Sequence, residues 1–240
     1  MRSRWSLLLG LMMSACAMGA AAEYGKASPA AAQQFEGVWM IDLKASGLPG
    51  GGPTPPQLTP SAAKQAAQNR AARARNDTSF DLTGHCSNPG MPRIMTLPNP
   101  IQIVARADAV MMIFEWNHLL RQIGVDAQHP FAPEYPMAIG ASNGRWEGNQ
   151  LRIQTNGRNA KTLLDDAIPN SAALQISENL QVSVDGNTLT DELTVTDAEV
   201  LVKPWTRTLV YRRKALTDIR ETDSCLDRLE HKDRAVPPGF

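Results

Sequence analysis

From residue 99 to residue 213, apolar and polar residues alternate with a period of two, which is typical of β-strands with one buried face. There are seven such runs, and most of them are joined by short turns rich in glycine, asparagine or aspartate. Another apolar, β-prone run lies near the start of the chain. The eight predicted strands cover residues 35–43, 101–106, 110–122, 137–147, 150–155, 174–184, 188–196 and 205–213.

Two junctions between these strands carry the composition of tight hairpins. Gly148-Asn149 and Gly186-Asn187 each stand at the centre of a two-residue turn, which pairs its flanking strands antiparallel. Eight consecutive strands leave two exposed edges unless the sheet closes, and a closed eight-stranded barrel is either filled by side chains or holds one small ligand. We therefore predict an all-β fold, an eight-stranded antiparallel up-and-down barrel. An open sandwich is the alternative.

A long insertion separates the first two predicted strands. Residues 47–56 contain four glycines and four prolines and therefore do not form regular structure. Thr59 followed by Pro60 is a helix-start signal, and residues 61–75 consist largely of Ala, Gln and Arg, which favour helices. We expect a linker and an accessory N-terminal helix within residues 47–76, lying over the barrel or across one end. A C-terminal tail follows the last strand.

The first 22 residues have the pattern of an export signal. Arg2 and Arg4 precede the apolar run 7–13, and the small residues 20–22 follow it. The mature protein is then one β-barrel domain, residues 23–240, and no other run approaches the roughly 20 apolar residues that span a bilayer. We predict a periplasmic or secreted protein without a transmembrane segment. Lipid attachment at Cys16, as in an outer-membrane lipoprotein, is the alternative.

The charge balance and the cysteines narrow the class of protein. Without the signal, 22 basic and 24 acidic side chains give a net charge of −2, so nucleic acid is not an expected partner. Cys86 and Cys225 remain and, in an oxidising compartment, predict one disulfide; two separate buried thiols are the alternative. The chain has no zinc-type Cys/His spacing, no phosphate-cradling glycine loop and no His-Glu-x-x-His motif, so we expect no metal and no other cofactor.

Two carboxylates are predicted to lie on apolar strand faces. The alternation in residues 174–184 groups Glu178 with the apolar side chains, and that in residues 188–196 does the same for Asp191. A buried carboxyl has either an ion-pair partner or a raised pKa, and a partly neutral carboxyl suits general acid or base catalysis. For Glu178, an internal ion pair with an arginine is the alternative role.

The spacing of these two carboxylates depends on the turn between their strands. A turn centred on Gly186-Asn187 would place Glu178 and Asp191 four positions apart along the hairpin. That separation is about 13 Å at the rise of an extended strand. It argues against a shared-proton pair and against a two-carboxylate glycosidase.

Residues 114–121 hold the second concentration of reactive side chains. His118 ends an apolar row that also contains Trp116, and its imidazole is a candidate acid or base. Arg121 lies on the other face, where it could bind an anionic group or pair with Glu115. The catalytic candidates are Glu178, His118 and Asp191, and the substrate-binding candidates are Arg121, Glu115, Trp116, Asn117 and, if the segment before residue 101 folds over this end, Arg93.

Short motifs resemble known families. Gly37-Val38-Trp39 is similar to the lipocalin and calycin signature, in which the tryptophan closes one end of the barrel and an arginine of the last strand packs over it. The resemblance assigns these roles to Trp39 and to Arg212 or Arg213. Over residues 86–225 the chain also resembles secreted bacterial proteins of no settled activity, through Cys86, Gly90-Met91-Pro92-Arg93, Gly144-Arg145-Trp146-Glu147-Gly148 and Pro204-Trp205. Both resemblances imply a secreted, calycin-like barrel, although the long insertion departs from the lipocalin pattern.

These features together predict a cofactor-independent barrel that binds a small hydrophobic or aromatic molecule. Proton transfer by a carboxyl and an imidazole needs neither a metal nor a nucleophile, so a lyase or isomerase acting on an aromatic compound is the leading hypothesis. A non-catalytic lipocalin-like carrier and a lipid-anchored structural envelope protein are the alternatives.

Overall fold

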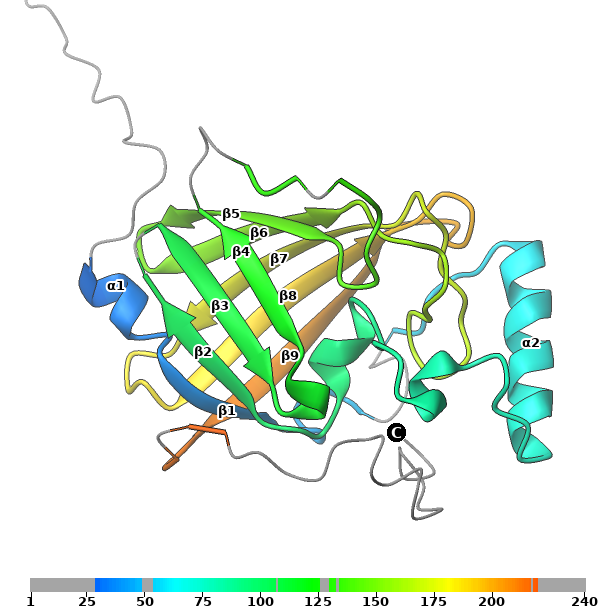
Figure 1. Ribbon diagram of the computed structural model, residues 1–240, viewed down its shortest axis with the longest axis horizontal. Coiled ribbons are helices and arrows are strands. Elements are labelled where there is room, and N and C mark those ends of the chain that lie inside the picture. Colours follow the sequence, from blue (N-terminus) through cyan, green and yellow to red (C-terminus); the bar gives the residue numbers. More distant parts are fainter. Residues whose placement is uncertain are drawn as a thin grey trace, which may run out of the picture.

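The computed structural model describes residues 29–48, 54–106, 108–125, 130–132, 134–216 and 218–219. In this part of the chain, nine strands form one closed barrel in which each strand pairs with its sequence neighbours and the last pairs with the first (Figure 1). The predicted all-β barrel is confirmed, with nine strands rather than eight. The strands are β1 (Gly37–Ile41), β2 (Ile101–Ala105), β3 (Ala109–Phe114), β4 (Leu120–Gly124), β5 (Ala141–Glu147), β6 (Gln150–Asn156), β7 (Gln175–Val182), β8 (Thr188–Thr196) and β9 (Trp205–Lys214).

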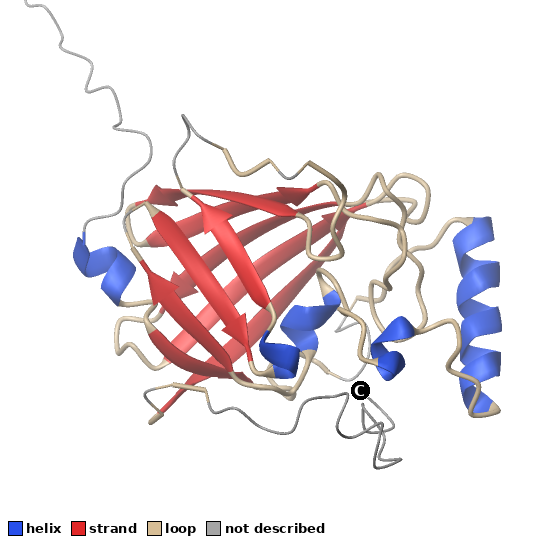
Figure 2. Cartoon of the chain, viewed as in Figure 1, coloured by secondary structure: helices blue, strands red, loops and turns tan. Residues whose placement is uncertain are grey.

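The helical segments lie at the two ends of the barrel. A short helix, α1, lies at one end, and α2 stands beyond the opposite end (Figure 2). Their bounds, with those of the 3-10 turns, are α1 (Pro29–Gln33), α2 (Pro60–Ala74), η1 (Leu82–His85), η2 (Arg93–Thr96) and η3 (Trp116–His118).

The extra strand arises because the predicted strand 110–122 is two strands. β3 ends at Phe114, η3 turns the chain, and β4 runs back antiparallel to β3. Inside the turn, Asn117 and His118 have φ angles of 52° and 48°. No strand residue adopts such a φ. The single predicted strand is therefore wrong, because its sequence contains a reversal that no glycine or proline marks.

The ninth strand changes the pairing of the whole barrel. An odd number of strands cannot close into a ring of purely antiparallel neighbours, because strand direction would have to alternate around an odd count. One pair is parallel, β4 with β5, through Ile123 opposite Ser142 and Gly124 opposite Asn143. The other eight pairs are antiparallel. The purely antiparallel up-and-down arrangement is therefore wrong at this one pair.

Of the two predicted two-residue turns, one is confirmed and one is wrong. Gly148-Asn149 joins β5 to β6 directly, because Glu147 pairs with Gln150. The loop between β7 and β8 instead has four residues, 184–187, since the amide of Ser183 donates to the carbonyl of Thr188. The longer loop shifts the register of β7 against β8 by two positions.

The barrel end next to α1, which we call the closed end, is sealed by aromatic side chains. Trp39 of β1 is fully buried, and its indole N–H donates to the carbonyl of Phe35 at 2.9 Å. The ring of Phe35 meets Trp146 of β5 edge to face, with ring centres 5.1 Å apart. The guanidinium carbon of Arg213 lies 4.1 Å from the centre of the Trp39 ring. Of the two arginines that the lipocalin resemblance offered, Arg213 is the one over Trp39, whereas Arg212 donates to Asp42 near the surface.

The opposite end, which we call the loop end, is covered by the chain between β1 and β2. Met91, Ile94 and Met95, in and beside η2, are almost completely buried in the barrel core. The predicted helix α2 is confirmed, with Thr59 accepting from the amide of Ala62 as its N-cap. Asn69 of this helix donates to the carbonyl of Ala167, so α2 is held by the loop that follows β6.

Several predictions concern residues outside the described ranges. The export signal, Cys16 and Cys225 all lie there, so signal cleavage, lipid attachment and the Cys86–Cys225 disulfide remain predictions, as does the localisation. Within the described ranges, no helix combines the length and the apolar character needed to cross a membrane.

Candidate functional site

The barrel interior contains a buried ion pair. Arg121 of β4 and Glu178 of β7 both point inward and are 1% and 3% exposed. The two Nη nitrogens of Arg121 donate to the two carboxylate oxygens of Glu178, one of them at 2.9 Å. Burial alone lowers the pKa of Arg121, but the charge and hydrogen bonds of Glu178 raise it beyond its usual value. The predicted inward orientation of Glu178 is confirmed, and its partner is Arg121; the predicted pairing of Arg121 with Glu115 is wrong.

The remaining donors of Arg121 tie further strands to this pair. Its Nε donates to the hydroxyl of Ser142 on β5, and Nη2 donates to the hydroxyl of Thr155 on β6, both at 3.0 Å. Nη1 also approaches the sulfur atoms of Met95 and Met112 at 3.8 Å. One guanidinium therefore links β4, β5, β6 and β7. It crosses the parallel β4–β5 pair, which is held by only two residue pairs in register.

Asp191 of β8 is an interior carboxyl without a partner. It is fully buried, and neither carboxylate oxygen accepts a hydrogen bond. It lies opposite Leu180, and because Glu178 precedes Leu180 by two positions, the two carboxylates are diagonal neighbours. Such neighbours are about 7–8 Å apart, so the predicted 13 Å separation is wrong. Burial, followed by the charge of Glu178, raises the pKa of Asp191 well above its usual value.

The raised pKa of Asp191 makes the stability of the protein depend on pH. In the unfolded chain Asp191 has the ordinary pKa of about 3.9, and in the native state its pKa is higher. At a pH between these two values the native state binds more protons than the unfolded state, so the free energy of unfolding falls as the pH rises. We expect Asp191→Asn, which has no such proton, to gain stability relative to the wild type as the pH rises above about 4, by about 1.4 kcal/mol per unit of pKa difference. Urea unfolding of both proteins at pH 4, 5.5 and 7 measures this. Parallel pH profiles for the two proteins would contradict it.

Tyr211 of β9 completes the interior cluster. Its hydroxyl donates to the carbonyl of Met95 at 2.7 Å and thereby joins the barrel wall to the segment that covers the loop end. Burial, together with the charges of Asp191 and Glu178, raises the pKa of Tyr211 well above its usual value. Tyr211 is therefore a neutral hydrogen-bond donor at any physiological pH.

Arg158 lies just beyond this cluster toward the loop end. It is 1% exposed, and its Nη groups donate to two backbone carbonyls, those of Thr155 at 3.2 Å and of Leu174. Its Nε is buried and has no hydrogen-bond partner. Burial, followed by the charge of Arg121, lowers the pKa of Arg158 to about 10.

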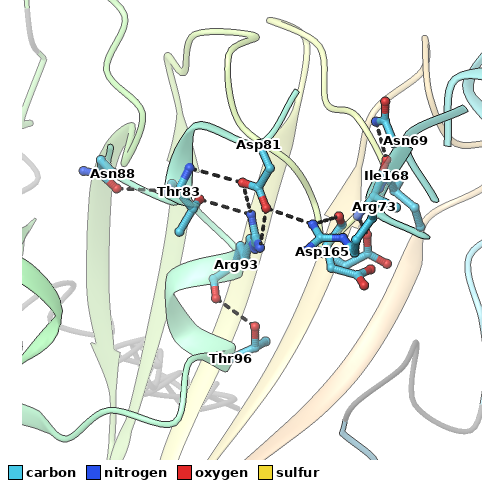
Figure 3. A network of polar contacts seen from close by, with 12 residues as sticks. Asn69, Arg73, Asp81, Thr83, Asn88, Arg93, Thr96, Asp165 and Ile168 are labelled. Carbon is cyan, nitrogen blue, oxygen red and sulfur yellow. Dashed lines mark hydrogen bonds and ion pairs between the residues drawn. The ribbon is translucent and has the colours of Figure 1, made fainter. Parts of the chain in front are cut away.

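Arg93 lies in a second polar network, between the barrel and α2. Its Nη nitrogens donate to both carboxylate oxygens of Asp81, at 2.7 and 2.9 Å, and Arg73 of α2 donates to the same carboxylate at 2.9 Å (Figure 3). The carboxylate also accepts from the amide of Thr83 at 3.1 Å. Arg93 reaches the loop end as predicted, but its guanidinium holds the covering segment in place. Its predicted contact with a substrate remains a prediction.

The candidates around His118 do not join the interior cluster. His118 is exposed on η3, so the predicted apolar row that ended in an interior imidazole is wrong. The side-chain amide of Asn99 donates to the carboxylate of Glu115 at 3.5 Å. The side-chain amide of Asn117 donates to the carbonyl of Cys86. Trp116 is buried, and its indole N–H has no hydrogen-bond partner.

A hollow of about 370 Å³ lies on the outer face of the barrel. The outward side chains of β5 to β9 line it, among them Arg152, Asn179 and Thr194. Inside the barrel, the side chains of Met95, Met112 and Phe114 are buried and belong to the apolar core. Met95 and Met112 contact Arg121, so the polar cluster is set within this apolar core.

No cluster of three or more His, Cys, Asp or Glu side chains with metal-binding geometry occurs among the residues that the structure describes. The chain matches no protein-family model, and no curated protein is significantly similar to it. The assignment of a function therefore depends on the interior cluster itself.

Three members of the cluster, and Arg158 beside it, were absent from the candidates predicted from sequence. Ser142 lies in a part of β5 where buried and exposed positions do not alternate cleanly. Thr155 could have been found, because it shares a face with Leu151 and Ile153. Tyr211 could have been found, because residues 205–213 alternate and place Tyr211 on the same face as Leu209. Arg158 follows the last alternating residue of β6, where no periodic signal exists.

Proposed function

We propose that this protein is a small-molecule-binding barrel and that its ligand contacts Asp191 in the interior. The observation that carries this proposal is the fully buried Asp191 carboxyl, which has no hydrogen-bond partner. An unsatisfied buried polar group costs about 1–3 kcal/mol, so an apolar residue at this position would give a more stable core. Buried ionisable groups with strongly shifted pKa values concentrate at functional sites.

The chemistry of the cluster favours acid catalysis by Asp191. A carboxyl whose pKa is raised keeps its proton to a higher pH than usual, and it can donate this proton to a ligand and recover it in a later step. Glu178 is less suited to this role, because both of its oxygens already accept hydrogen bonds from Arg121. We therefore propose a cofactor-independent lyase or isomerase acting on a small hydrophobic or aromatic compound, with Asp191 rather than His118 as the acid. In a carrier of the lipocalin sort, the same carboxyl would only orient the ligand.

Access to Asp191 requires movement at the loop end. Met91, Ile94 and Met95 fill this end, and Tyr211 and Arg121 both contact Met95. We propose that the segment around η2 withdraws when a ligand enters. Export to the periplasm or beyond, with the Cys86–Cys225 disulfide formed there, is also part of this proposal and is supported by the signal pattern of residues 1–22.

A thermal-shift screen of small aromatic and aliphatic compounds tests this function. Ligands that bind the folded state raise the unfolding temperature. We expect at least one hit whose stabilising effect changes in Asp191→Asn but not in Asn179→Asp, a variant on the outer face. If the protein is an enzyme, Asp191→Asn should bind the hit and lose its turnover; a carrier should show no turnover in either protein. A screen in which every hit acts equally on both variants would refute an interior site at Asp191.

A further inference from the structure

We infer that Arg158 forms an anion-binding subsite of the interior and that the ligand of the barrel carries a carboxylate. This inference rests on the proposed function, because it assumes a ligand in the interior. It adds the class of compound, a small organic acid with an apolar body.

The first observation is that Arg158 is a buried cation without a counter-ion. It is 1% exposed, and in the described part of the chain its side chain donates hydrogen bonds only to two carbonyls, those of Thr155 and Leu174. An isolated buried charge costs several kcal/mol, and buried arginines are normally paired with a carboxylate or phosphate. Arg121 and Arg93, by contrast, each donate to both oxygens of a carboxylate.

The second observation is that the two carboxylates nearest in charge effect, Asp197 and Glu178, already accept hydrogen bonds from other groups. The carboxylate of Asp197 accepts from the amide and the hydroxyl of Ser171, at 2.8 and 2.7 Å, and from the amide of Glu199. Glu178 is bound by Arg121. The charges of Glu178 and Asp197 favour the cationic form of Arg158, and that of Arg121 opposes it. The surroundings therefore leave the positive charge of Arg158 uncompensated by any contact.

The third observation is that one edge of this guanidinium is still able to donate. Nε has no hydrogen-bond partner, and a guanidinium binds the two oxygens of a carboxylate side-on through Nε and a neighbouring Nη. A single edge suits the two oxygens and single charge of a carboxylate. A phosphate group carries a charge of about −1.5 to −2 and three acceptor oxygens, more than one guanidinium edge matches.

The position of Arg158 fits a ligand that also reaches Asp191. Thr155 joins the two arginines, since its hydroxyl accepts from Arg121 and its carbonyl accepts from Arg158. Arg158 follows the end of β6, so it lies on the loop-end side of the Arg121–Glu178 pair. A ligand anchored there by its carboxylate would extend its apolar body into the core toward Asp191.

Matched acids and amides test this inference. Each probe is a small carboxylate, such as phenylacetate or 3-phenylpropanoate, paired with its own neutral amide. We expect the acid to bind the wild-type protein at least tenfold more tightly than the amide at pH 7. In Arg158→Gln the affinity for the acid should fall at least tenfold while that for the amide is unchanged. Arg152→Gln, an exposed arginine of the same strand region, should behave as the wild type does.

Further variants keep the outcome decisive. Arg158→Lys retains the charge but loses the Nε edge, and we expect it to keep part of the preference for acids even if Arg158→Gln does not fold. Equal affinity for acids and amides would overturn the carboxylate subsite while leaving the proposed barrel function intact. Failure of every acid and amide to bind would overturn both.

Discussion

Glu178→Gln should destabilise the protein by about 3–5 kcal/mol, the cost of removing one partner from a buried ion pair. Glutamine keeps the shape of the side chain but removes the charge that Arg121, 1% exposed, requires. The amide oxygen of the glutamine would still accept from one Nη group of Arg121, but its NH2 group would face the other Nη group, and both are donors. Urea unfolding at pH 7, with the midpoint and slope fitted for each protein, measures the change.

Two comparisons separate this effect from a general sensitivity of the strands. The double variant Arg121→Met/Glu178→Leu should recover most of the lost stability, because a buried ion pair replaced by apolar side chains is often neutral or favourable. Glu147→Gln breaks the exposed pairs with Arg145 and Arg152 and should leave the unfolding midpoint nearly unchanged. If Glu178→Gln were as stable as Glu147→Gln, the Arg121–Glu178 pair would not contribute to the stability of the barrel.

The buried pair could be predicted from the sequence only in part. Alternation correctly placed Glu178 and Asp191 among inward apolar side chains, because in a strand each side chain's face follows from its position. The partner of Glu178 could not be predicted, since Arg121 lies 57 residues away and comes from a strand that was merged with its neighbour. Separating β3 from β4 depends on the positive φ of Asn117 and His118. Asparagine accepts this conformation readily, but histidine gives only a weak signal.

The register between β7 and β8 shows how local hydrogen bonds can override a turn composition. Gly186-Asn187 favours a two-residue hairpin, yet Asp185 accepts from Ser183 and from the amide of Asn187, and the amide of Thr188 donates to Ser183. These side-chain bonds stabilise a four-residue loop instead. The resulting two-residue shift brings Asp191 beside Glu178, so the electrostatics of the interior depend on a turn at the surface.

Asp81→Asn should loosen the segment that covers the loop end and destabilise the protein by about 3 kcal/mol, as for other broken buried ion pairs. Asp81 is the common acceptor for Arg93, which is 3% exposed, and for Arg73 of α2. Burial raises the pKa of Asp81, but the hydrogen bonds and charge of Arg93 and the hydrogen bond of Arg73 outweigh this effect, so the folded pKa lies below the usual one. The stabilisation is therefore complete above the unfolded pKa of about 3.9 and is lost as the pH falls through the lowered value.

Hydrogen exchange can show whether this loosening is local. The amides of Ile94 and Met95 donate to the carbonyls of Gly90 and Pro92 within the covering segment. We expect these two amides to exchange faster in Asp81→Asn than in the wild type, by a larger factor than the amides of β7 and β8. Asp77→Asn, an exposed aspartate whose side chain accepts only from Ser79, serves as the control and should leave these rates unchanged. Since Met95 also contacts Tyr211 and Arg121, a segment released in this way should admit ligands to the interior faster. Faster exchange without faster ligand binding would show that the route to Asp191 does not pass through η2.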